Sequence, residues 1–576
     1  MCGILGIRQT LATRADAARA LQALAWRGPD DQTLLAAGGW WLGVTRLAIS
    51  DKSAPQPIVC PRTGRIALWN GAVTSAAAEW QEFGPRARTR NDAELLLLRL
   101  ETHGEQALAR GSGHGAGAVL DPRDGTLWFV RDAEREKPLF VVLDGNSVVA
   151  FASTAAALQA LGLPLELTPA ERSRFFRFGF FTHVSSAAPG LQVLDDLRGA
   201  AVARGGRDLQ PVAGLPPGPA TGSLRDRLIE AARRSASAEV PVGLALSGGI
   251  DSSCLAAALD AADRHLPAYQ FCADGAPTAE RALAHRVARR FGHQLVEVGG
   301  NAALLRELPW LVRCAGLPLG DPSLLAVHAL GRRASQDGIK VLLSGEGSDE
   351  LFLGYPRHRA ARILPRHGLR WLPAPAWSMR RTARLLRACQ APVPAEVLLE
   401  ATPAAFRRQV LTAPDLPPLR TQESCLTTLV RLDREQYLAC DLLPKLDVAW
   451  MAAGIEGRCP FLDHAVKSAP EVRPPASARP GKHALRRAFA ATVPAAVFRQ
   501  KKRGFALPLD RWLGEDPWLL DLLAEPRSLA RPHLRAQAVT PLLAAQRQGH
   551  LGLGHAWFLL AAFELWLRDR EAARCA

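Results

Sequence analysis

A cysteine at position 2 gives this chain a nucleophile next to its first residue, in the segment Met1-Cys2-Gly3. If Met1 is removed, Cys2 carries a thiol and a free α-amino group on the same residue. The α-amino group titrates at pH ~7.7–8, so it can accept the thiol's proton and activate the sulfur as a nucleophile. The alternative is that Cys2 is an incidental residue at a chain end, and the motifs elsewhere favour the first interpretation.

A second chemical segment is the glycine- and serine-rich stretch at residues 247–253, which reads Ser-Gly-Gly-Ile-Asp-Ser-Ser and follows an apolar run ending at Leu246. Its glycines let backbone N–H groups approach a polyphosphate, its serines add donors, and a following helix N-terminus favours an anion. Asp251 can hold the Mg²⁺ that neutralises such phosphates. No Gly-Lys-Ser/Thr follows, so the segment differs from the P-loop of kinases and GTPases.

A third segment, residues 344–350, reads Ser-Gly-Glu-Gly-Ser-Asp-Glu and also follows an apolar run. Three carboxylates so close together repel one another unless a metal or another cation lies between them. If both loops end parallel strands, they lie at the edge where open α/β sheets bind ligands. An ordinary helix-capping turn for the first loop, and a solvated acidic turn for the second, are the structural alternatives.

The elements that must position these residues differ between the two halves of the chain. In roughly the first 200 residues, short apolar runs bounded by turn residues predict strands at 40–44, 65–69, 126–130 and 148–151, with helices at 15–24 and after Asn91-Asp92. From Ser223 onward, predicted helices at 224–237, 252–262 and 322–336 alternate with strands at 240–246 and 340–343, which indicates a parallel, doubly wound sheet. The remainder is predicted to be mostly helical, with a buried helix at 551–563.

Length and composition bound the domain organisation. A chain of 576 residues is too long for one ordinary core, so we expect at least two domains. Between residues 204 and 222 the chain is rich in glycine and proline, which is typical of a linker. We therefore expect domains at 1–203 and 223–576.

Charge and cysteine content bear on partners and compartment. The net charge is +16, but the arginines are scattered, with no long basic run and no aromatic stacking motif, so no nucleic-acid partner is expected. The basic surface can attract anionic substrates such as ATP. Ten dispersed cysteines without CxxC spacing favour reduced thiols in a cytoplasm. No signal peptide is recognised, the run at 551–563 is too short for membrane insertion, and a homodimer is left open.

Taken together, these segments resemble glutamine-hydrolysing asparagine synthetases over nearly the full length of the chain. The resemblance implies an α+β N-terminal Ntn-hydrolase αββα sandwich, which would be a class II glutaminase. It implies a following α/β ATP-pyrophosphatase (adenine nucleotide alpha hydrolase-like) domain with a helical C-terminal part. In that family, ammonia released from glutamine travels through an internal tunnel, and ATP with Mg²⁺ converts the aspartate carboxylate to an acyl-adenylate that ammonia attacks.

The resemblance assigns roles in the first half of the chain. Cys2 is implied to be the glutaminase nucleophile, and the side-chain amide of Asn70 with the backbone N–H of Gly71 is implied to form the oxyanion hole. Residues 27–30 match the family's Arg-Gly-Pro-Asp. An arginine is implied to clamp the glutamine α-carboxylate and an aspartate its α-amino group, and the residues implied to bind glutamine are Arg46, Leu47, Ile49 and Asp92.

In the second half, the implied roles fall on the two loops and a lysine. Glu346 is implied to accept a proton from the attacking ammonia, and Lys482 to stabilise charge during adenylation. Asp251 and Asp349 are implied to hold Mg²⁺. Two further segments match family signatures, and a buried ion network is an equal interpretation of three of their residues, Lys445, Asp447 and Arg458. The residues implied to bind ATP and pyrophosphate are Leu246, Ser247, Gly248, Gly249, Asp251, Ser252, Ser344 and Gly345.

The departures from the family pattern lie in the first half. The family has Glu-Ile-Tyr-Asn after Asn-Gly, whereas this chain has Ala-Val-Thr-Ser at 72–75. Losing one charge-assisted hydrogen bond to the glutamine ammonium costs ~1.5–3 kcal/mol, which corresponds to roughly 10–100-fold weaker binding. Thr154 replaces a family glutamate, and the loop at 131–138 lacks the usual glycine.

Three functions therefore remain open. The first is asparagine synthesis from glutamine, ATP and aspartate. The second uses the same ATP chemistry on another carboxylate, in an amidotransferase acting on a sugar acid or peptide, or in a cyclase forming a β-lactam or lasso peptide. The third is a non-catalytic glutamine- or nucleotide-sensing protein, which the intact loops at 247–253 and 344–350 disfavour.

Overall fold

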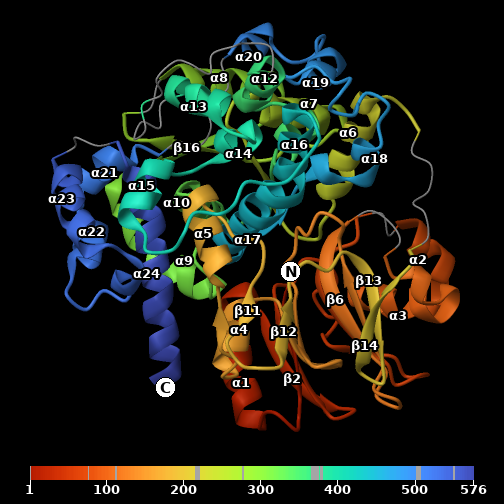
Figure 1. Cartoon of the computed structure of the whole chain (residues 1–576). Coiled ribbons are helices and arrows are strands. Elements are labelled where there is room, and N and C mark those ends of the chain that lie inside the picture. Colours follow the sequence, from red (N-terminus) through yellow and green to blue (C-terminus); the bar gives the residue numbers. More distant parts are fainter. Residues whose placement is uncertain are drawn as a thin grey trace.

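The computed structural model describes residues 2–74, 77–109, 113–214, 221–275, 278–364, 375, 381–500, 507–548 and 552–575. Its elements form two sheet-containing regions, one ending at residue 212 and the other beginning at residue 224. Helices of the C-terminal part contact both regions (Figure 1).

Twelve strands of the N-terminal region form one sheet, in the order β2-β3-β1-β9-β14-β13-β7-β6-β5-β4, with β8 paired to β9 and to β12. The strands are β1 (Cys2–Arg8), β2 (Asp31–Ala37), β3 (Trp40–Arg46), β4 (Ile58–Val59), β5 (Ile66–Ala72), β6 (His114–Leu120), β7 (Leu127–Arg131), β8 (Phe140–Asp144), β9 (Ser147–Ala152), β12 (Leu191–Leu194), β13 (Gly199–Arg204) and β14 (Arg207–Val212). The helices packed on them are α1 (Arg14–Gln22), α3 (Asp92–His103) and α4 (Ala155–Ala160).

Side-chain alternation along these strands produces four layers. Cys2 of β1 and Leu68 of β5 share one buried cluster between the two halves of the sheet. Their neighbours face the opposite sides: Leu5 packs in the cluster that contains α1, and Trp69 packs with residues of α3. The layers therefore follow the expected order of helix, sheet, sheet and helix. The two halves are nevertheless hydrogen-bonded into one sheet, because β14 pairs with β13 and, through Arg207 and Ser147, with β9.

Strand β14 corrects the expected linker. Its residues lie within 204–222, where the glycine- and proline-rich composition predicted a connection between domains. Gly205 and Gly206, with φ of +59° and +72°, instead form the turn between β13 and β14. Composition marked a hairpin here, and the sheet continues beyond residue 203. Residues 215–220 lie outside the described part of the chain.

The second region contains a parallel sheet in the order β17-β16-β15-β18-β19. Because β15 lies between β16 and β18, the loops that follow β15 and β18 meet at the carboxyl edge, where open α/β sheets bind ligands. The expected parallel, doubly wound arrangement is thus confirmed. The elements are β15 (Val242–Ala245), β16 (Ala268–Ala273), β17 (Leu295–Gly300), β18 (Val341–Leu343) and β19 (Glu456–Arg458), with α6 (Leu224–Ser235), α7 (Ile250–Ala261), α8 (Thr278–Arg290) and α10 (Ser323–Gln336).

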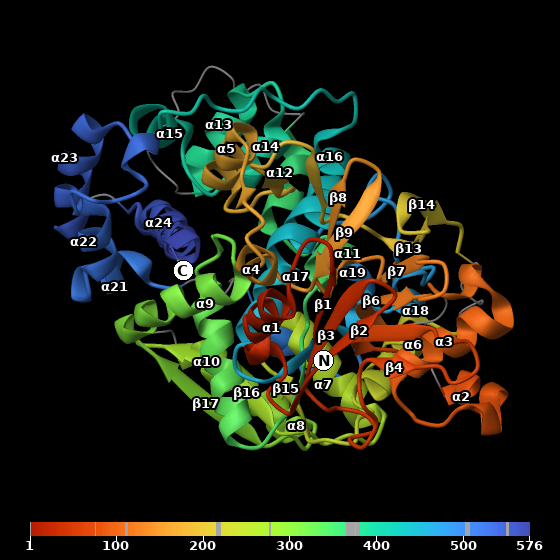
Figure 2. The same ribbon diagram turned by 90° about the horizontal axis from the view of Figure 1, so that it is seen from below.

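Helices form most of the C-terminal part, as expected. One continuous run consists of α16 (Cys425–Leu432), a ten-residue π-helix η7 (Asp433–Leu442) and α17 (Leu443–Met451). Such π-helical segments are rare and occur frequently at functional sites. Figure 2 shows the last helices gathered at one side of the molecule: they are α21 (Leu509–Glu515), α22 (Trp518–Ala524), α23 (Ala536–Arg547) and α24 (Gly554–Cys575). Residues 554–563 of the buried helix expected at 551–563 form the first part of α24, which extends well beyond residue 563, and residue 551 lies outside the described part of the chain.

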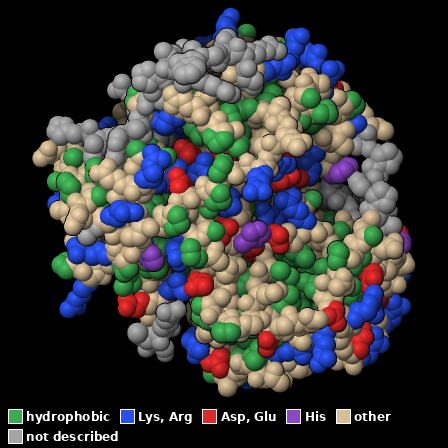
Figure 3. All heavy atoms as spheres, in the orientation of Figure 1, with side chains coloured by type: hydrophobic (Ala, Val, Ile, Leu, Met, Phe, Trp, Pro, Cys, Tyr) green, Lys and Arg blue, Asp and Glu red, His purple; other side chains and the backbone are tan. Residues whose placement is uncertain are grey.

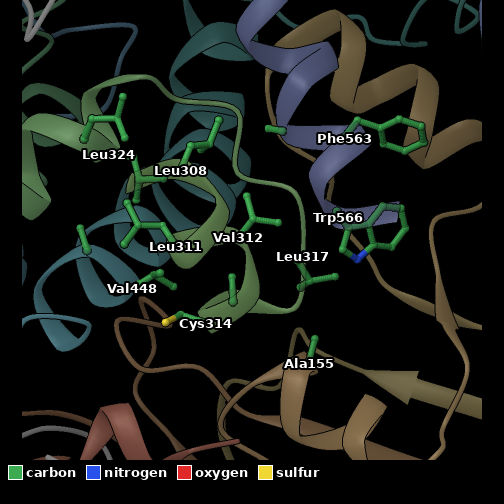
Figure 4. Close-up of a cluster of buried hydrophobic side chains, with 14 of the residues drawn as sticks. Ala155, Leu308, Leu311, Val312, Cys314, Leu317, Leu324, Val448, Phe563 and Trp566 are labelled. Atoms are coloured by element: carbon green, nitrogen blue, oxygen red, sulfur yellow. The ribbon is translucent and has the colours of Figure 1, made fainter. Parts of the chain in front are cut away.

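An apolar cluster joins the two regions. At its centre is α9 (Leu308–Ala315), whose side chains face Val448 of α17 and Trp566 of α24 (Figure 4). At the end of α9 the backbones themselves touch: a Cβ on Gly316, whose φ is +68°, would lie 2.2 Å from the backbone nitrogen of Ala156. Only glycine fits this position, because any side chain would push the end of α9 away from α4.

A buried ion pair also joins the regions. Arg27 binds Asp447 of α17 with both guanidinium nitrogens, at 2.7 and 3.2 Å, and neither side chain is accessible to solvent beyond 1%. Lys137 lies 3.5 Å from the same carboxylate and donates to the carbonyl of Gly457 at 3.0 Å. Burial favours the neutral carboxyl, but the Arg27 and Lys137 cations outweigh it and hold the pKa of Asp447 below its usual value.

The charged side chains and the cysteines are dispersed in the structure as they are in the sequence. Figure 3 shows Lys and Arg side chains spread over one face and intermixed with Asp and Glu. The nine cysteines whose side chains are described are free thiols. In the described residues, no helix is both long and apolar enough to cross a membrane.

Replacing Asp447 by alanine leaves the buried Arg27 without its carboxylate. We expect the free energy of unfolding to fall by about 3–5 kcal/mol, measured by urea denaturation, because an uncompensated buried charge is costly. The matched control is Glu230→Ala, which breaks an exposed ion pair with Arg233 and should cost at most about 1 kcal/mol. Equal, small losses in the two variants would contradict the importance of the buried pair.

Candidate active sites

Cys2 is the first residue of β1 and lies at the end of the sheet core. It pairs with Arg46 of β3, its backbone nitrogen donates to Asn70 Oδ1 at 3.1 Å, and its thiol lies 3.6 Å from Gln56 Nε2. Burial raises the pKa of the Cys2 thiol, while the N-terminal amine and Arg46 act in the opposite direction. The thiol is thus enclosed, and the positive charges of the amine and of Arg46 favour its thiolate while burial and the charge of Glu456 oppose it.

The two residues expected to form an oxyanion hole, Asn70 and Gly71, lie next to each other at the end of β5. Asn70 follows Trp69 on β5, and its Nδ2 is buried without a hydrogen-bond partner among the described residues. Gly71 has φ +150°, and a Cβ there would lie 2.2 Å from the carbonyl oxygen of His114. A buried amide nitrogen without an acceptor is costly, so a donor held ready for a developing negative charge is a consistent explanation.

The Arg-Gly-Pro-Asp motif orders the segment that begins at Arg46. A Cβ on Gly28 would lie 2.3 Å from the backbone nitrogen of Arg46, so the two backbones are in direct contact. Asp30 accepts a hydrogen bond from the backbone nitrogen of Ala48 at 2.8 Å. Arg27 donates to the carbonyl of Cys2 at 3.3 Å. The motif therefore ties the nucleophile's strand to the segment expected to bind glutamine.

In that segment, the three expected residues present different groups. Arg46 donates to the carbonyls of Asp51 and Lys52 at 2.5 and 2.9 Å, which fixes its guanidinium beside Cys2. The side chains of Leu47 and Ile49 pack into the apolar cluster of the second region. Only their backbone groups can therefore face Cys2, and a hydrogen bond from the backbone of Leu47 acts to lower the pKa of the Cys2 thiol.

Asp92 lies at the start of α3, and its carboxylate accepts from the backbone nitrogen of Val73 at 2.9 Å. Burial raises its pKa to about 6, and the charge of Glu456 adds to this effect. Ala72, in place of the family's glutamate, pairs with His114 across the strands. Position 72 therefore offers no second carboxylate. Ser75, another departure from the family pattern, lies outside the described residues. Thr154, which replaces a family glutamate, caps the N-terminus of α4.

Sequence reasoning missed a residue of the second region beside this site. Glu456 of β19 is fully buried, lies 3.4 Å from His114 Nε2, and forms an ion pair with Arg458 at 2.5 Å. Burial opposes its ionisation, but Arg458 and the N-terminal amine lower the pKa of Glu456 well below its usual value. No local pattern around Glu456 indicates a place next to Cys2, because the two residues meet only through the domain contact.

The first nucleotide loop turns sharply at the end of β15. Gly248 has φ +75°, and a Cβ on it would lie 2.8 Å from the backbone nitrogen of Ala284, so the loop is pressed against α8. Gly249 precedes the first residue of α7, and the hydroxyls of Ser247 and Ser252 lie 3.1 Å apart. Leu246 is buried and anchors the strand end. Backbone N–H groups, hydroxyls and a helix N-terminus thus converge as a polyphosphate site requires.

The second loop lies directly against the first. A Cβ on Gly345 would lie 3.0 Å from the Cβ of Asp251 and 3.4 Å from the backbone nitrogen of Ser252. Ser348 donates to Asp251 at 2.6 Å. Ser344 is held by a hydrogen bond from its backbone nitrogen to the carbonyl of Arg458, at 2.9 Å. The structure therefore brings together all the residues expected to bind ATP and pyrophosphate.

Lys482 supplies the cation that the clustered acids need. Its ammonium lies 2.5 Å from Asp251 Oδ2 and 2.7 Å from Asp349 Oδ1, so the two carboxylates converge on one point. Lys482 itself has φ +61°, a left-handed conformation that is costly for a residue with a side chain. No group of three or more His, Cys, Asp or Glu residues in the described chain could hold a metal alone. Two carboxylates fit Mg²⁺, which takes its remaining ligands from phosphates and water.

Lys445, Asp447 and Arg458, which the sequence left open between a functional role and a buried ion network, all form buried ion pairs. Lys445 binds Asp321 at 2.8 Å, and Asp447 and Arg458 pair with Arg27 and Glu456. All three therefore have the ion-pair partners that the ion-network interpretation expects. The Lys445 pair borders the reaction site, since the charge of Glu346 contributes to a raised pKa of Lys445.

Comparison with known proteins supports both halves. The sequence model for asparagine synthase matches residues 223–568, and the model for a glutamine amidotransferase domain matches residues 1–206. Asparagine synthetase [glutamine-hydrolyzing] 1 of Bacillus subtilis is 25% identical over 92% of this chain and 91% of its own length. Asparagine synthetase 3 of Arabidopsis thaliana is 28% identical over 62% of this chain and 61% of its own.

Another relative bears a different name. Amidase chry2 of Gibberella zeae is 27% identical over 59% of this chain and 55% of its own length. The glutamine amidotransferase match covers the first sheet as far as the turn before β14, and the asparagine synthase match begins just before α6 and covers the second sheet. The synthase match spans more than half of the chain, and the chain belongs to the asparagine synthase family.

Proposed function

We propose that this protein forms an amide from glutamine, ATP and a carboxylate, with aspartate as the acceptor and a β-aspartyl-AMP intermediate. The observation that carries the proposal is the convergence of the loops at 247–253 and 344–350 on Lys482. The residues to the end of β14 would act as glutaminase and those from 223 to 576 as synthetase, in a cytoplasm that keeps the thiols reduced.

In the glutaminase half, the Cys2 sulfur attacks the glutamine amide carbon after Met1 has been removed. The developing oxyanion lies against the Nδ2 of Asn70 and the backbone N–H of Gly71. Asp92 and Arg46 hold the α-amino and α-carboxylate groups of glutamine. Ammonia leaves, and water then releases glutamate from the acyl-enzyme.

In the synthetase half, the acceptor carboxylate attacks the α-phosphate of ATP. Serine hydroxyls and backbone N–H groups of the first loop bind the pyrophosphate that departs. Asp251 and Asp349 would hold Mg²⁺, which supplies positive charge to the phosphates. Lys482 stabilises the same charge from the protein side, and Glu346 takes a proton as ammonia attacks the acyl-adenylate.

Another carboxylate acceptor, in an amidotransferase or a lactam- or lasso-forming cyclase, is the second candidate. The Gibberella zeae relative named an amidase and the loss of the carboxylate at position 72 favour it. Release of AMP and pyrophosphate with aspartate, compared with a panel of other carboxylates, distinguishes the two functions.

Replacing Cys2 by alanine should lower glutamine-driven product at least about 10³-fold, because the thiol that attacks the glutamine amide is lost. Product formed from added ammonia should stay within about twofold of the unmodified protein. Both rates are measured as AMP release. Equal loss of both would show that Cys2 is not a dedicated source of ammonia.

Replacing Asp251 by alanine should lower acceptor-dependent release of AMP and pyrophosphate at least about 100-fold, since one of two metal-binding carboxylates is lost. Asp260→Ala serves as the matched control, because Asp260 is a partly exposed carboxylate on the same helix. Undiminished AMP release in the Asp251 variant would refute its role at the phosphates.

Glutamine binding should weaken as the pH falls below about 6, the pKa of Asp92. The Asp92 carboxyl becomes neutral there and loses its attraction for the glutamine ammonium, so the Kd rises about tenfold per pH unit. Calorimetry on the Cys2→Ala variant measures this without interference from the thiol. In a Cys2→Ala/Asp92→Asn variant the pH dependence should disappear, and its persistence would assign it to another group.

A further inference from the structure

A cavity of about 100 Å³ lies between the two regions, and Arg27 is one of its lining residues. Aromatic side chains of the N-terminal region, among them Phe140 and Phe180, form one wall. The opposite wall consists of the segment after α9, including Leu317 and Leu319, and of the π-helix η7 near Cys440. Domain interfaces are a preferred place for ligand pockets, and this one is mostly apolar.

Arg135 projects into this cavity from a strained position. It is the residue with φ +62° in the loop at 131–138, which lacks the glycine that usually permits such a turn. Its Nη2 donates to the carbonyl of Glu435 at 3.2 Å and to the thiol of Cys440 at 3.1 Å. Its Nε is buried without a hydrogen-bond partner, although the residue is only 6% exposed.

Two guanidinium groups at the cavity lack an ion-pair partner among the described residues. No carboxylate of the described residues forms an ion pair with Arg135 or with Arg131, which also lines the cavity and donates to the carbonyls of Lys137 and Asp195, each at 2.7 Å. Burial lowers the pKa of Arg131 to about 10, and the neighbouring Arg135 contributes to that shift. The two guanidinium groups therefore repel each other in a site with little water.

The acids that line the cavity form no ion pair with these cations, although the charges of Asp132 and Asp195 act to raise the pKa of Arg131. Asp447 is engaged by Arg27, and Asp195 accepts from the backbone nitrogen of Val184 at 3.0 Å. Burial and the charge of Asp321 raise the pKa of Asp441 well above its usual value, which favours its neutral form. A buried cation without a counter-ion is unfavourable, and an anionic ligand would remove that cost.

We propose that this cavity binds a small organic carboxylate with an apolar body. Its carboxylate accepts the Nε–H of Arg135, and its body packs between Phe180 and Leu319. This site is distinct from those for glutamine and ATP, and it goes beyond the proposed function.

The occupant would contact both catalytic regions. On one side, the cavity is lined by Arg27, whose Nε donates to the carbonyl of Cys2. On the other, it is lined by Asp441, whose pKa is affected by the charges of Lys445 and Glu346. A carboxylate bound here is therefore either part of the acceptor or an effector of the reaction. In both cases the same groups recognise it, namely the Arg135 guanidinium and the apolar walls.

Calorimetric titration with butyrate and benzoate, each compared with its neutral amide, tests the proposal without glutamine or ATP. The unmodified protein should bind at least one carboxylate and bind the matching amide about 10–100-fold more weakly, because a charge-assisted hydrogen bond is lost. Arg135→Gly should reduce carboxylate binding by the same factor while relieving the strained backbone. Release of AMP on adding the carboxylate with ATP identifies it as acceptor, and a changed rate with aspartate identifies it as effector.

Asp263→Gly is the matched control, since Asp263 is an exposed residue with φ +54° far from the cavity. It relieves a left-handed backbone without removing a guanidinium, and its carboxylate binding should equal that of the unmodified protein. The proposal is overturned if the carboxylates do not bind, if carboxylate and amide bind alike, or if Arg135→Gly binds the carboxylate undiminished.

Discussion

The buried contact of Arg27 with Asp447 is the interaction on which the arrangement of both active sites depends. Neither charge has access to water, so each is stable only while the other is in place. The same guanidinium donates to the carbonyl of Cys2, and Asp447 belongs to α17, which packs beneath the parallel sheet. The position of the nucleophile is therefore coupled to the second region by direct polar contacts, and the apolar cluster around α9 packs residues of both regions together. Separating the regions would expose both the charges and the apolar cluster.

A second connection runs through β19. Its last residue, Arg458, accepts the hydrogen bond that positions Ser344, and its first, Glu456, lies next to His114 beside the glutamine site. One short strand thus contacts both the loop that carries Glu346 and the residues around Cys2. Because Glu456 also raises the pKa of Asp92, the second region contributes to the electrostatics of the first site. In the proposed reaction, this strand borders the route between the place where ammonia is released and the place where it is used.

The sequence predicts those features that are encoded locally. Strand and helix periodicity, the turn glycines of 247–253 and the acids of 344–350 are all short-range signals, and the structure brings the expected residues together. The failures are long-range. The Gly205-Gly206 hairpin has the composition of a linker, and only the pairing of its strands with β7 and β9 shows that it belongs to the sheet. Glu456 and the Arg27–Asp447 pair connect residues hundreds of positions apart. The sequence shows that the loop at 131–138 lacks a glycine. Only the backbone shows that Arg135 adopts the left-handed conformation that a glycine would otherwise take there.

Lys482 shows how one side chain can serve the nucleotide site both with and without ligands. Asp251 and Asp349 converge so closely that they need a cation between them, and the ammonium of Lys482 fills this place. A bound Mg²⁺ would satisfy the same carboxylates, and the ammonium could then move to the phosphates, where the proposed adenylation develops negative charge. This exchange requires a lysine whose backbone is fixed within reach of both places. The left-handed conformation of Lys482, held by its backbone hydrogen bond to Phe352, provides that fixed origin, so its strain is explained by the position it must keep.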